Sequence, residues 1–437
     1  MTSTLSRPLV LPSSASPMYE RTALPDGPRV ISARMPGTRS LSIAVYVLAG
    51  SRLETRERSG VAHFMEHVTF KGTRNFPTTS AVSEAIEGCG GSSNAATDRE
   101  STVYWARLPV READRAFNVL SELVVRPLLR DTDIARERDI IVEEIRSYRD
   151  DSGQFVFNLF DRAFFGDTPL GWEIAGEEES VRALAVEDIR TFWSQTYRPS
   201  NLVVSVAGDL EHSDVVDFVS NYFGTGTATV PGFETAPAVP NERFTFEERD
   251  LAQAHLCVGL PALRRDHPDQ WALEMMNTIL GEGSSSRLFQ KVREDAGLAY
   301  DVHSFQTDYS DVGTLQVYAG VDPTDMTQAI DAILTELRRL RDEPVGADEL
   351  ARARAYASGR LELKLEESRH VSAWLGVQEA LHERVLTLDE AIAELDKVTP
   401  ATIQTLAQEL IRDESLCLSV IAPTGTVSGL ESALKLN

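Results

Sequence analysis

Two histidines and a glutamate lie within five consecutive residues of the first half of the chain. His63, Glu66 and His67 form the pattern H-x-x-E-H in the segment GVAHFMEHV, which begins at Gly60. On a helix, residues i and i+4 share a face, so both imidazoles can reach one metal ion. Zinc suits such nitrogen ligands, and Glu66 can accept a proton from water without binding the metal. The order is the reverse of H-E-x-x-H.

The alternative is a helix in which two histidines share a face by chance, since the chain has 8 histidines in 437 residues. Apolar residues surround the motif, among them Val61, Ala62, Met65 and Val68. This favours a packed helix over a solvated one. A catalytic zinc centre takes three protein ligands and leaves one position for water. A third ligand must therefore come from elsewhere in the chain.

The segment Asp131–Asp150 predicts a helix that could supply this ligand. At about 100° per residue, one apolar stripe is expected along it, made of Ile134, Ile141, Ile145 and Tyr148. Glu137 and Glu144 lie at the edge of this stripe, whereas Glu143 points away from it. A carboxylate next to buried surface needs a partner, and a metal is one. We expect Glu144 as the third ligand and Glu137 as the group that holds a histidine ring nitrogen; the alternative is a solvated helix flank.

The composition is that of a soluble globular protein. Lys+Arg is 43 and Asp+Glu is 67, so the formal net charge is −24, which argues against a nucleic-acid partner. No apolar run approaches the roughly 18–20 residues that span a bilayer, and the first sixteen residues lack the apolar segment of a secretory signal. Three scattered cysteines suit a reducing compartment. We expect a cytoplasmic protein without a membrane partner.

The order of expected elements repeats along the chain. Strands, helices, two further strands and further helices precede the strand Asn201–Ala207, and the same order precedes Ser415–Ile421. Between the two runs, residues 224–240 are rich in Gly, Thr and Pro, which indicates a linker. We predict an α+β fold of two duplicated domains, 1–223 and 241–437, joined by the linker 224–240.

Four segments in this order resemble one family. GVAHFMEHVTFKGT (Gly60–Thr73) is similar to the zinc motif of the pitrilysin/insulinase-type inverzincin peptidases, most nearly their mitochondrial-processing-peptidase-like branch. The resemblance extends to the spacing of Glu137 and Glu144 and to GGSSNAATDRE (Gly90–Glu100). In the second half it continues in SSRLFQKVREDAGLAY (Ser285–Tyr300).

The resemblance implies roles for individual residues. One zinc ion per chain would be bound by His63, His67 and Glu144, with Glu66 as general base and Glu137 orienting a ligand. The peptide substrate would lie on an edge as an added β-strand, a mode that reads the main chain and tolerates many sequences. The residues implied to bind substrate are Phe64, Asn94, Ala95, Ala96 and Thr97.

The second half would contribute Arg293 and Tyr300, which resemble the pair that holds substrate and stabilises a tetrahedral oxyanion. In this branch, the second domain of one subunit faces the zinc domain of another. The resemblance therefore implies two domains, each a mostly antiparallel sheet with helices packed on it, and a clamshell dimer that encloses a chamber. Because one chain carries both sets of residues, a homodimer with a composite active site is favoured.

The expected activity is that of a zinc metalloendopeptidase acting on short or unfolded peptides. Two alternatives remain at this stage: a non-catalytic core-type subunit of the same fold, and the zinc subunit of a heterodimeric peptidase. If part of the net charge of −24 lines the chamber, electrostatic focusing would favour basic peptides.

Overall fold

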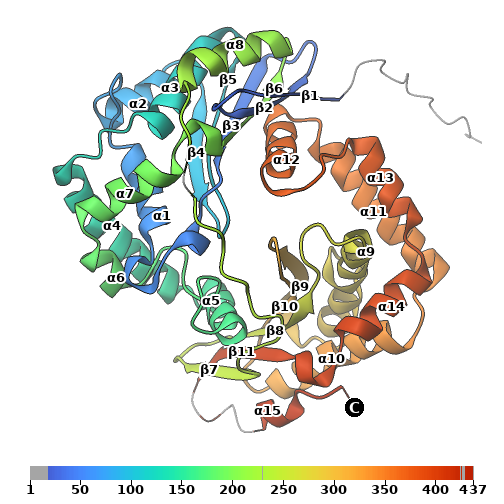
Figure 1. Cartoon of the computed structure of the whole chain (residues 1–437). Helices are drawn as coiled ribbons and strands as arrows, with labels where there is room; N and C mark the ends of the chain where they lie inside the picture. The colour runs from blue at the N-terminus through green and yellow to red at the C-terminus, as the bar shows by residue number, and fades with distance from the viewer. Residues whose placement is uncertain (1–17, 229, 424, 426–428, 437) are drawn as a thin grey trace, which may run out of the picture.

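The computed structural model describes residues 18–228, 230–423, 425 and 429–436. It contains two β-sheets, one in each half of the chain, with helices packed on both (Figure 1). The expected α+β fold of two duplicated domains is confirmed. No helix in the described part of the chain has both the length and the apolar character needed to cross a bilayer.

The first sheet has six strands in the order β1-β2-β6-β3-β5-β4. All neighbours are antiparallel except β2 and β6, which are parallel. The strands β3 and β6 are buried almost throughout, which predicts that both faces of the sheet are covered. The bounds are β1 Glu20–Ala23, β2 Arg29–Arg34, β3 Ser40–Val47, β4 Ser92–Thr97, β5 Thr102–Pro109 and β6 Leu202–Gly208.

The second sheet has five strands in the order β7-β11-β8-β10-β9, again with one parallel pair, β7 and β11. This order repeats the last five strands of the first sheet, with β7 in the place of β2 and β9 in the place of β4. The duplication is thus visible in strand order and direction. The bounds are β7 Phe244–Glu248, β8 Ala254–Ala262, β9 Ala299–Asp308, β10 Gly313–Val321 and β11 Cys417–Ala422.

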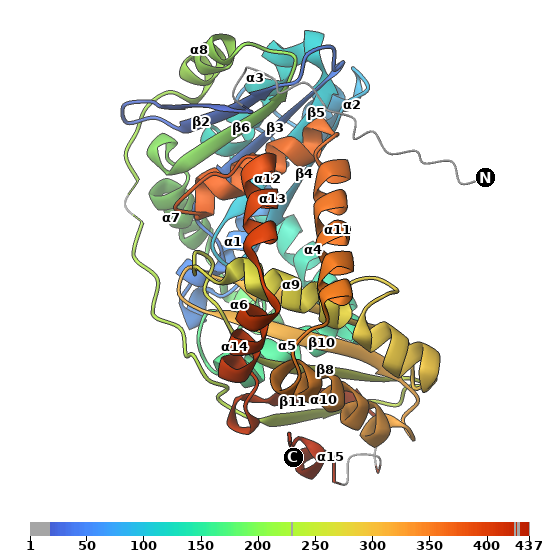
Figure 2. The ribbon, with the colours of Figure 1, turned by 90° about the vertical axis from the view of Figure 1, so that its right-hand side faces the viewer.

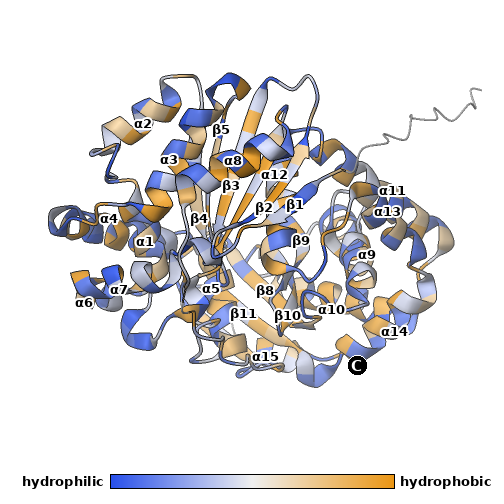
Figure 3. Ribbon diagram, turned by 45° about the horizontal axis from the view of Figure 1, so that its top comes forward, coloured by the Kyte–Doolittle hydropathy of each residue, from blue (hydrophilic) through white to orange (hydrophobic). Residues whose placement is uncertain are grey.

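Helices of each half form a large apolar core on one face of the sheet of that half. In Figure 3 the strands of the first sheet are largely orange between helices that alternate orange and blue, as amphipathic helices do. On the first sheet these are α1 Val61–Thr69, α2 Thr79–Glu87, α3 Ala113–Val125, α4 Asp131–Asp150, α6 Glu178–Ala183, α7 Val186–Thr196 and α8 His212–Phe223. On the second they are α9 Gln270–Gly281, α10 Met326–Asp342, α11 Ala347–Lys364, α13 Leu388–Lys397, α14 Pro400–Leu410 and α15 Leu430–Ala433.

Two helices are exchanged between the halves. The helix α5 (Ser152–Phe165) belongs to the first half but packs on the second sheet, where Phe160 joins a core with Cys257 and Ile421. The helix α12 (Ser368–Leu381) belongs to the second half but packs on the other face of the first sheet, where Leu375 joins a core with Tyr46. Figure 1 shows both helices beside strands of the other colour range.

Both exchanged helices approach their sheets closely at a glycine. A Cβ atom at Gly259 of β8 would lie 2.4 Å from the ring of Phe160, and one at Gly376 of α12 would lie 2.3 Å from the ring of Tyr46. The exchange therefore depends on matched glycine–aromatic contacts on both sheets.

The predicted linker has neither helix nor strand at its described residues. It runs along one side of the molecule from the end of α8 towards β7 (Figure 2). Near its end it contacts both halves, because the Glu234 carbonyl accepts from Arg52 and the Ala236 amide donates to Asp311. A π-helical segment, η5 (Phe289–Asp295), precedes β9.

Candidate metal centre

The start of α1 is fixed by its backbone. Gly60 precedes the helix with φ +92°, and a Cβ atom there would lie 2.6 Å from the Ala175 carbonyl oxygen. Both conditions require glycine. The buried carboxylate of Glu54 accepts from the backbone N–H of Gly60 and of Ala62, at 2.8 Å each. These bonds satisfy N–H groups that a helix start leaves unpaired.

Three side chains converge between α1 and α4. The rings of His63 and His67 lie with their centroids 4.6 Å apart. The Nε2 atoms of both rings face Glu144, at 3.9 Å from Oε1 for His63 and 3.2 Å from Oε2 for His67. One ligand atom from each of the three residues lies within 4.8 Å of the others. Two imidazole nitrogens and one carboxylate oxygen are a donor set of catalytic zinc sites, so these residues fit that metal.

The second ring nitrogen of His67 has its own partner. Its Nδ1 lies 3.3 Å from Oε1 of Glu137, whose other oxygen lies 2.6 Å from Nζ of Lys71. A carboxylate at this position selects the tautomer that leaves Nε2 free for a metal. Lys71 was not foreseen from the sequence, although it lies four residues after His67 and just beyond the end of α1.

The carboxylates make the centre favourable for a positive charge. Burial, and then the neighbouring His67, lower the pKa of His63 to about 4. Burial also acts against protonation of His67, but hydrogen bonds to Glu137 and Glu144 outweigh it and raise that pKa to about 9. Hydrogen bonding to His67 is the main reason why the pKa of Glu144 falls to about 2. A bound divalent cation would supply the charge that these groups favour.

Glu66 lies beside the centre and has a partner on the edge strand. Its Oε2 accepts a hydrogen bond of 2.6 Å from Oγ1 of Thr97, the last residue of β4. Burial raises the pKa of Glu66 above its usual range, although the bond from Thr97 works in the other direction. A carboxylate with a raised pKa is a better proton acceptor near neutral pH.

A cavity of about 430 Å³ connects these groups. It is lined by the two histidines and Glu66, by Ala95, Ala96 and Thr97 of β4, and by Glu144 and Tyr148 of α4. Residues of α5 and of the segment 173–175 form the rest of the wall. Among the described strands, β4 pairs with β5 alone and lies at the edge of its sheet, beside the cavity. Its outer edge can thus accept another strand.

The residues implied to bind substrate do not all reach this cavity. Phe64 has no exposed surface and lies in the core of the first half, so the prediction for Phe64 is wrong. Its position on α1 lies about 100° from His63, which turns it away from the metal. Asn94 is exposed on β4, but its Oδ1 accepts from the Ala95 backbone N–H at 2.9 Å.

Arg293 and Tyr300 lie together but apart from the cavity. The Arg293 guanidinium lies 5.3 Å from the centroid of the Tyr300 ring, and 79% of Tyr300 is exposed. The described residues that line the cavity all come from the first half of the chain. Within one chain, the structure therefore brings this pair together without placing it at the metal centre.

Tyr148 departs from its predicted place. Ile134, Ile141 and Ile145 are buried as the apolar stripe predicts, whereas 49% of Tyr148 is exposed and its side chain lines the cavity. The signal was present in the sequence, because Tyr148 follows Glu144 by four residues and so shares its helix face.

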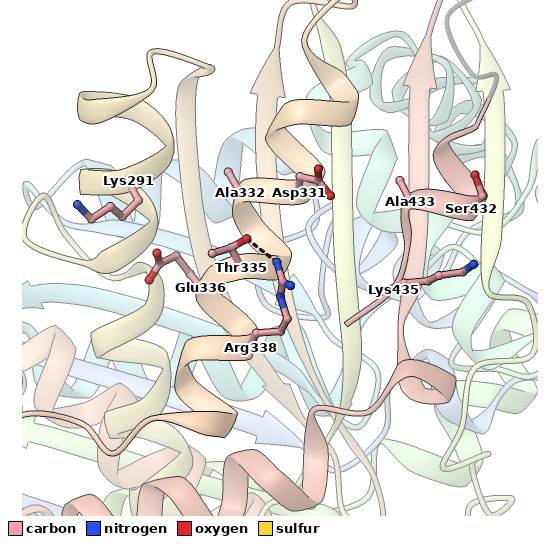
Figure 4. Close-up of a pocket in the computed structure, with 9 residues that line it drawn as sticks. All are labelled: Lys291, Asp331, Ala332, Thr335, Glu336, Arg338, Ser432, Ala433 and Lys435. Carbon is pink, nitrogen blue, oxygen red and sulfur yellow. Dashed lines mark hydrogen bonds between the residues drawn. The ribbon is translucent and has the colours of Figure 1, made fainter. Parts of the chain in front are cut away.

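A second cavity, of about 560 Å³, lies between η5, α10 and α15 (Figure 4). Two of its charged groups form ion pairs with neighbours, Lys291 with Asp295 at 2.6 Å and Glu336 with Arg339 at 3.0 Å. Arg338 donates to Thr335 at 2.7 Å. It contains no histidine or cysteine and is more typical of a surface depression.

Two family models match the chain. The model described as Insulinase (Peptidase family M16) matches residues 29–178, which include the whole candidate metal centre. The model described as Peptidase M16 inactive domain matches residues 183–356.

Curated relatives match nearly the full length. An uncharacterized zinc protease of Streptomyces coelicolor is 34% identical, over 92% of this chain and 89% of the relative. An uncharacterized zinc protease of Bacillus subtilis is 33% identical, over 94% of this chain and 100% of the relative. A probable mitochondrial-processing peptidase subunit beta of Arabidopsis thaliana is 30% identical, over 94% of this chain and 79% of the relative.

Solved structures share the fold. A protease from Helicobacter pylori has a TM-score of 0.88 at 22% identity and covers 93% of this chain and 100% of its own. A structure from Pseudomonas fluorescens, titled as a peptidase M16 inactive domain, has a TM-score of 0.85 at 19% identity, with 93% and 98% covered.

Proposed function

The chain belongs to the M16 (insulinase) peptidase family, and from this premise we propose that it is a zinc metalloendopeptidase that cleaves short or unfolded peptides. One observation carries the proposal. His63, His67 and Glu144 offer three ligand atoms within 4.8 Å of one another, in a cavity that also contains Glu66 and borders an unpaired strand edge. A non-catalytic core subunit would need none of these groups to converge.

We assign one zinc ion per chain to His63, His67 and Glu144. When bound, zinc supplies Lewis acidity that polarises a peptide carbonyl and makes water more acidic. Glu66 accepts a proton from the attacking water and passes it to the nitrogen of the leaving amine. Glu137 keeps the His67 ring in the orientation that binds metal, with its charge balanced by Lys71.

The substrate would bind as an added strand along the free edge of β4. Ala95 and Ala96 line the cavity, and their small side chains allow a second backbone to approach. Hydrogen bonds to main-chain groups require an extended peptide, so folded proteins are poor substrates. The three cysteines are free thiols, which supports a cytoplasmic location.

We further propose a homodimer that encloses a chamber. Arg293 and Tyr300 would then act on the cavity of the partner subunit. The support is that the pair is assembled and exposed, yet does not line the cavity of its own chain. The other possible arrangement, a heterodimer with a different chain, is separated from this one by the mass of the active particle.

The catalytic proposal is tested with Glu66→Gln. We expect this variant to keep one zinc per chain by elemental analysis and to lose peptide hydrolysis, because the amide cannot accept the proton. Glu143→Gln is the matched control, since Glu143 is exposed on α4 next to Glu144. Wild-type turnover in Glu66→Gln would refute the proposed role.

The dimer proposal is tested by mixing inactive variants. After subunit exchange, Glu66→Gln mixed with Arg293→Ala should regain activity, because one of the two composite sites is then intact. Glu66→Gln mixed with His63→Ala should stay inactive, because both changes affect the metal-binding half. No recovery in the first mixture after proven exchange would exclude the composite site.

A further inference from the structure

We propose that Tyr148 is a further catalytic residue, whose phenol hydroxyl donates a hydrogen bond to the oxyanion that forms at the scissile carbonyl. The proposal rests on the peptidase function proposed above. It places an oxyanion donor in the same half of the chain as the metal ligands, in addition to the pair Arg293 and Tyr300.

The first support is position. Tyr148 lies one helical turn after Glu144 on α4, so both side chains leave the same face of the helix. Its side chain lines the 430 Å³ cavity together with His63, Glu66 and Glu144. With 49% of its surface exposed, the ring lies at the solvent side of the centre, where a substrate arrives.

The second support is the contact of the hydroxyl. The Tyr148 hydroxyl interacts with the Glu144 carboxylate. The donor thus lies beside a metal ligand, within reach of a peptide carbonyl held at the same centre.

The third support is the charge of the cavity. A tetrahedral intermediate is an anion, yet the charged residues that line the cavity are Glu66, Glu144 and Glu173, together with the histidines. Among the described lining residues there is no lysine or arginine. A side chain of this half that assists the metal in stabilising the new charge must therefore be a neutral donor.

Other neutral donors are less well placed. Thr97 donates to Glu66, so its hydroxyl is directed at the proposed general base and not at a metal ligand. Gln154 and Asn158 lie on α5, on a different wall from the metal ligands. Tyr300 is 79% exposed and lies outside the cavity of its own chain. Tyr148 is the donor next to the ligand set.

The experiment uses Tyr148→Phe, which removes the hydroxyl and keeps the ring. Loss of one oxyanion donor lowers kcat by about 10²–10³-fold in well-studied cases. We expect kcat to fall by at least about tenfold with KM changed by less than about twofold, because the bond forms in the transition state. The inhibition constant of a phosphinic peptide, which mimics the tetrahedral intermediate, should rise by a similar factor.

Zinc content separates catalysis from a structural role. Tyr148→Phe should keep one zinc per chain, and excess zinc should not restore kcat. Restoration by zinc would show that Tyr148 only holds Glu144, and unchanged kcat and inhibitor binding would show no role; either result overturns the proposal. Tyr222→Phe is the control, since Tyr222 bonds to Asp114 on the surface. If the zinc-loaded wild type cleaves no peptide, the peptidase function fails and Tyr148 loses its assignment with it.

Discussion

Thr97 donates a hydrogen bond of 2.6 Å from its Oγ1 to Oε2 of Glu66. The bond joins the last residue of β4 to the side chain proposed as general base. A shift of the strand would therefore also move the carboxylate. We infer that binding of a peptide along β4 and orientation of Glu66 depend on the same few atoms.

Replacing Thr97 with valine removes this bond at nearly constant volume. We expect kcat to fall about tenfold or more, because a hydrogen bond to a charged group contributes about 1.5–3 kcal/mol. Zinc content should not change, and Thr97→Ser should restore most of the activity. Steady-state kinetics with one peptide decides the matter, with Thr79→Val, an exposed threonine of α2, as control. Equal kcat in Thr97→Val and wild type would contradict this role.

We expect Glu137 to affect zinc affinity more than the rate of peptide hydrolysis by the zinc-loaded protein. Glu137→Gln weakens its interaction with Nδ1 of His67 and leaves Lys71 without its charged partner. Loss of such an outer partner typically weakens metal binding by about 10–100-fold. Competition with a chromophoric chelator measures this affinity. Asp139→Asn, an exposed position on the same helix, should bind zinc as the wild type does; similar affinity in both variants would rule out the effect.

A buried charge cluster joins the two halves. Glu100 lies 2.7 Å from Arg52 and 2.7 Å from Arg265 of the second half, and it also accepts from Ser310. Removing one member leaves the other charges buried without compensation. Glu100→Ala should lower the free energy of unfolding by about 3–5 kcal/mol.

The control is an exposed pair that also crosses between the halves. Arg107 and Glu367 are 3.8 Å apart with largely accessible side chains. Glu367→Gln should therefore change stability by less than about 1 kcal/mol. Urea denaturation of both variants compares the two directly. Similar small losses would mean that the Glu100 cluster does not hold the halves together.

Glu54 should make stability depend on pH. Burial raises its pKa from 4.5 in the reference state to about 8, in spite of the bonds from Ala62 and Gly60. Between these values the folded protein retains a proton that the unfolded chain has released. The contribution of Glu54 to stability is therefore largest at low pH and falls as the pH rises towards about 8.

The test compares Glu54→Gln with the wild type across this range. The amide cannot titrate, so the stability deficit of the variant should shrink as the pH rises from 5 to 8. Thermal unfolding at several pH values provides the measurement. Glu57→Gln, at an exposed position nearby, should show a difference from the wild type that does not shrink in this way. A constant deficit for Glu54→Gln would reject the assignment.

Much of the candidate metal centre could be predicted because its residues obey helix periodicity. The spacing of His63 and His67 places both on one face, and Glu144 lies at the edge of a stripe that is buried at Ile141 and Ile145. The same rule failed at Tyr148, because a helix that borders a cavity has no uniform apolar face. The role of Phe64 came from the family resemblance and not from its angle on the helix, which turns its side chain into the core.

The exchanged helices could not be predicted in this way. The sequence of α5 is rich in phenylalanine and contains the buried residues Phe160 and Phe164, which predicts burial but not the sheet that provides it. Helix α12 contains Ser368, Ser372 and Gly376, small residues whose types do not predict that they are buried. Their role becomes clear only from the packing of α12 on the first sheet. There the Ser372 hydroxyl donates to the Ser205 carbonyl, and the Ser205 hydroxyl donates to the Ser372 carbonyl.

The exchange of α5 and α12 has a consequence for the unit in which this chain folds. The two helices occupy equivalent places, since each is the third helix after the β5–β3 or β10–β8 strand pair of its half. The topology is that of a domain-swapped dimer whose two protomers have been fused into one polypeptide. A cut in the segment 224–240 would leave each fragment with one uncovered face of its sheet and one helix without a sheet to pack on. We expect the two fragments to associate and complete each other's packing, and neither to fold stably alone.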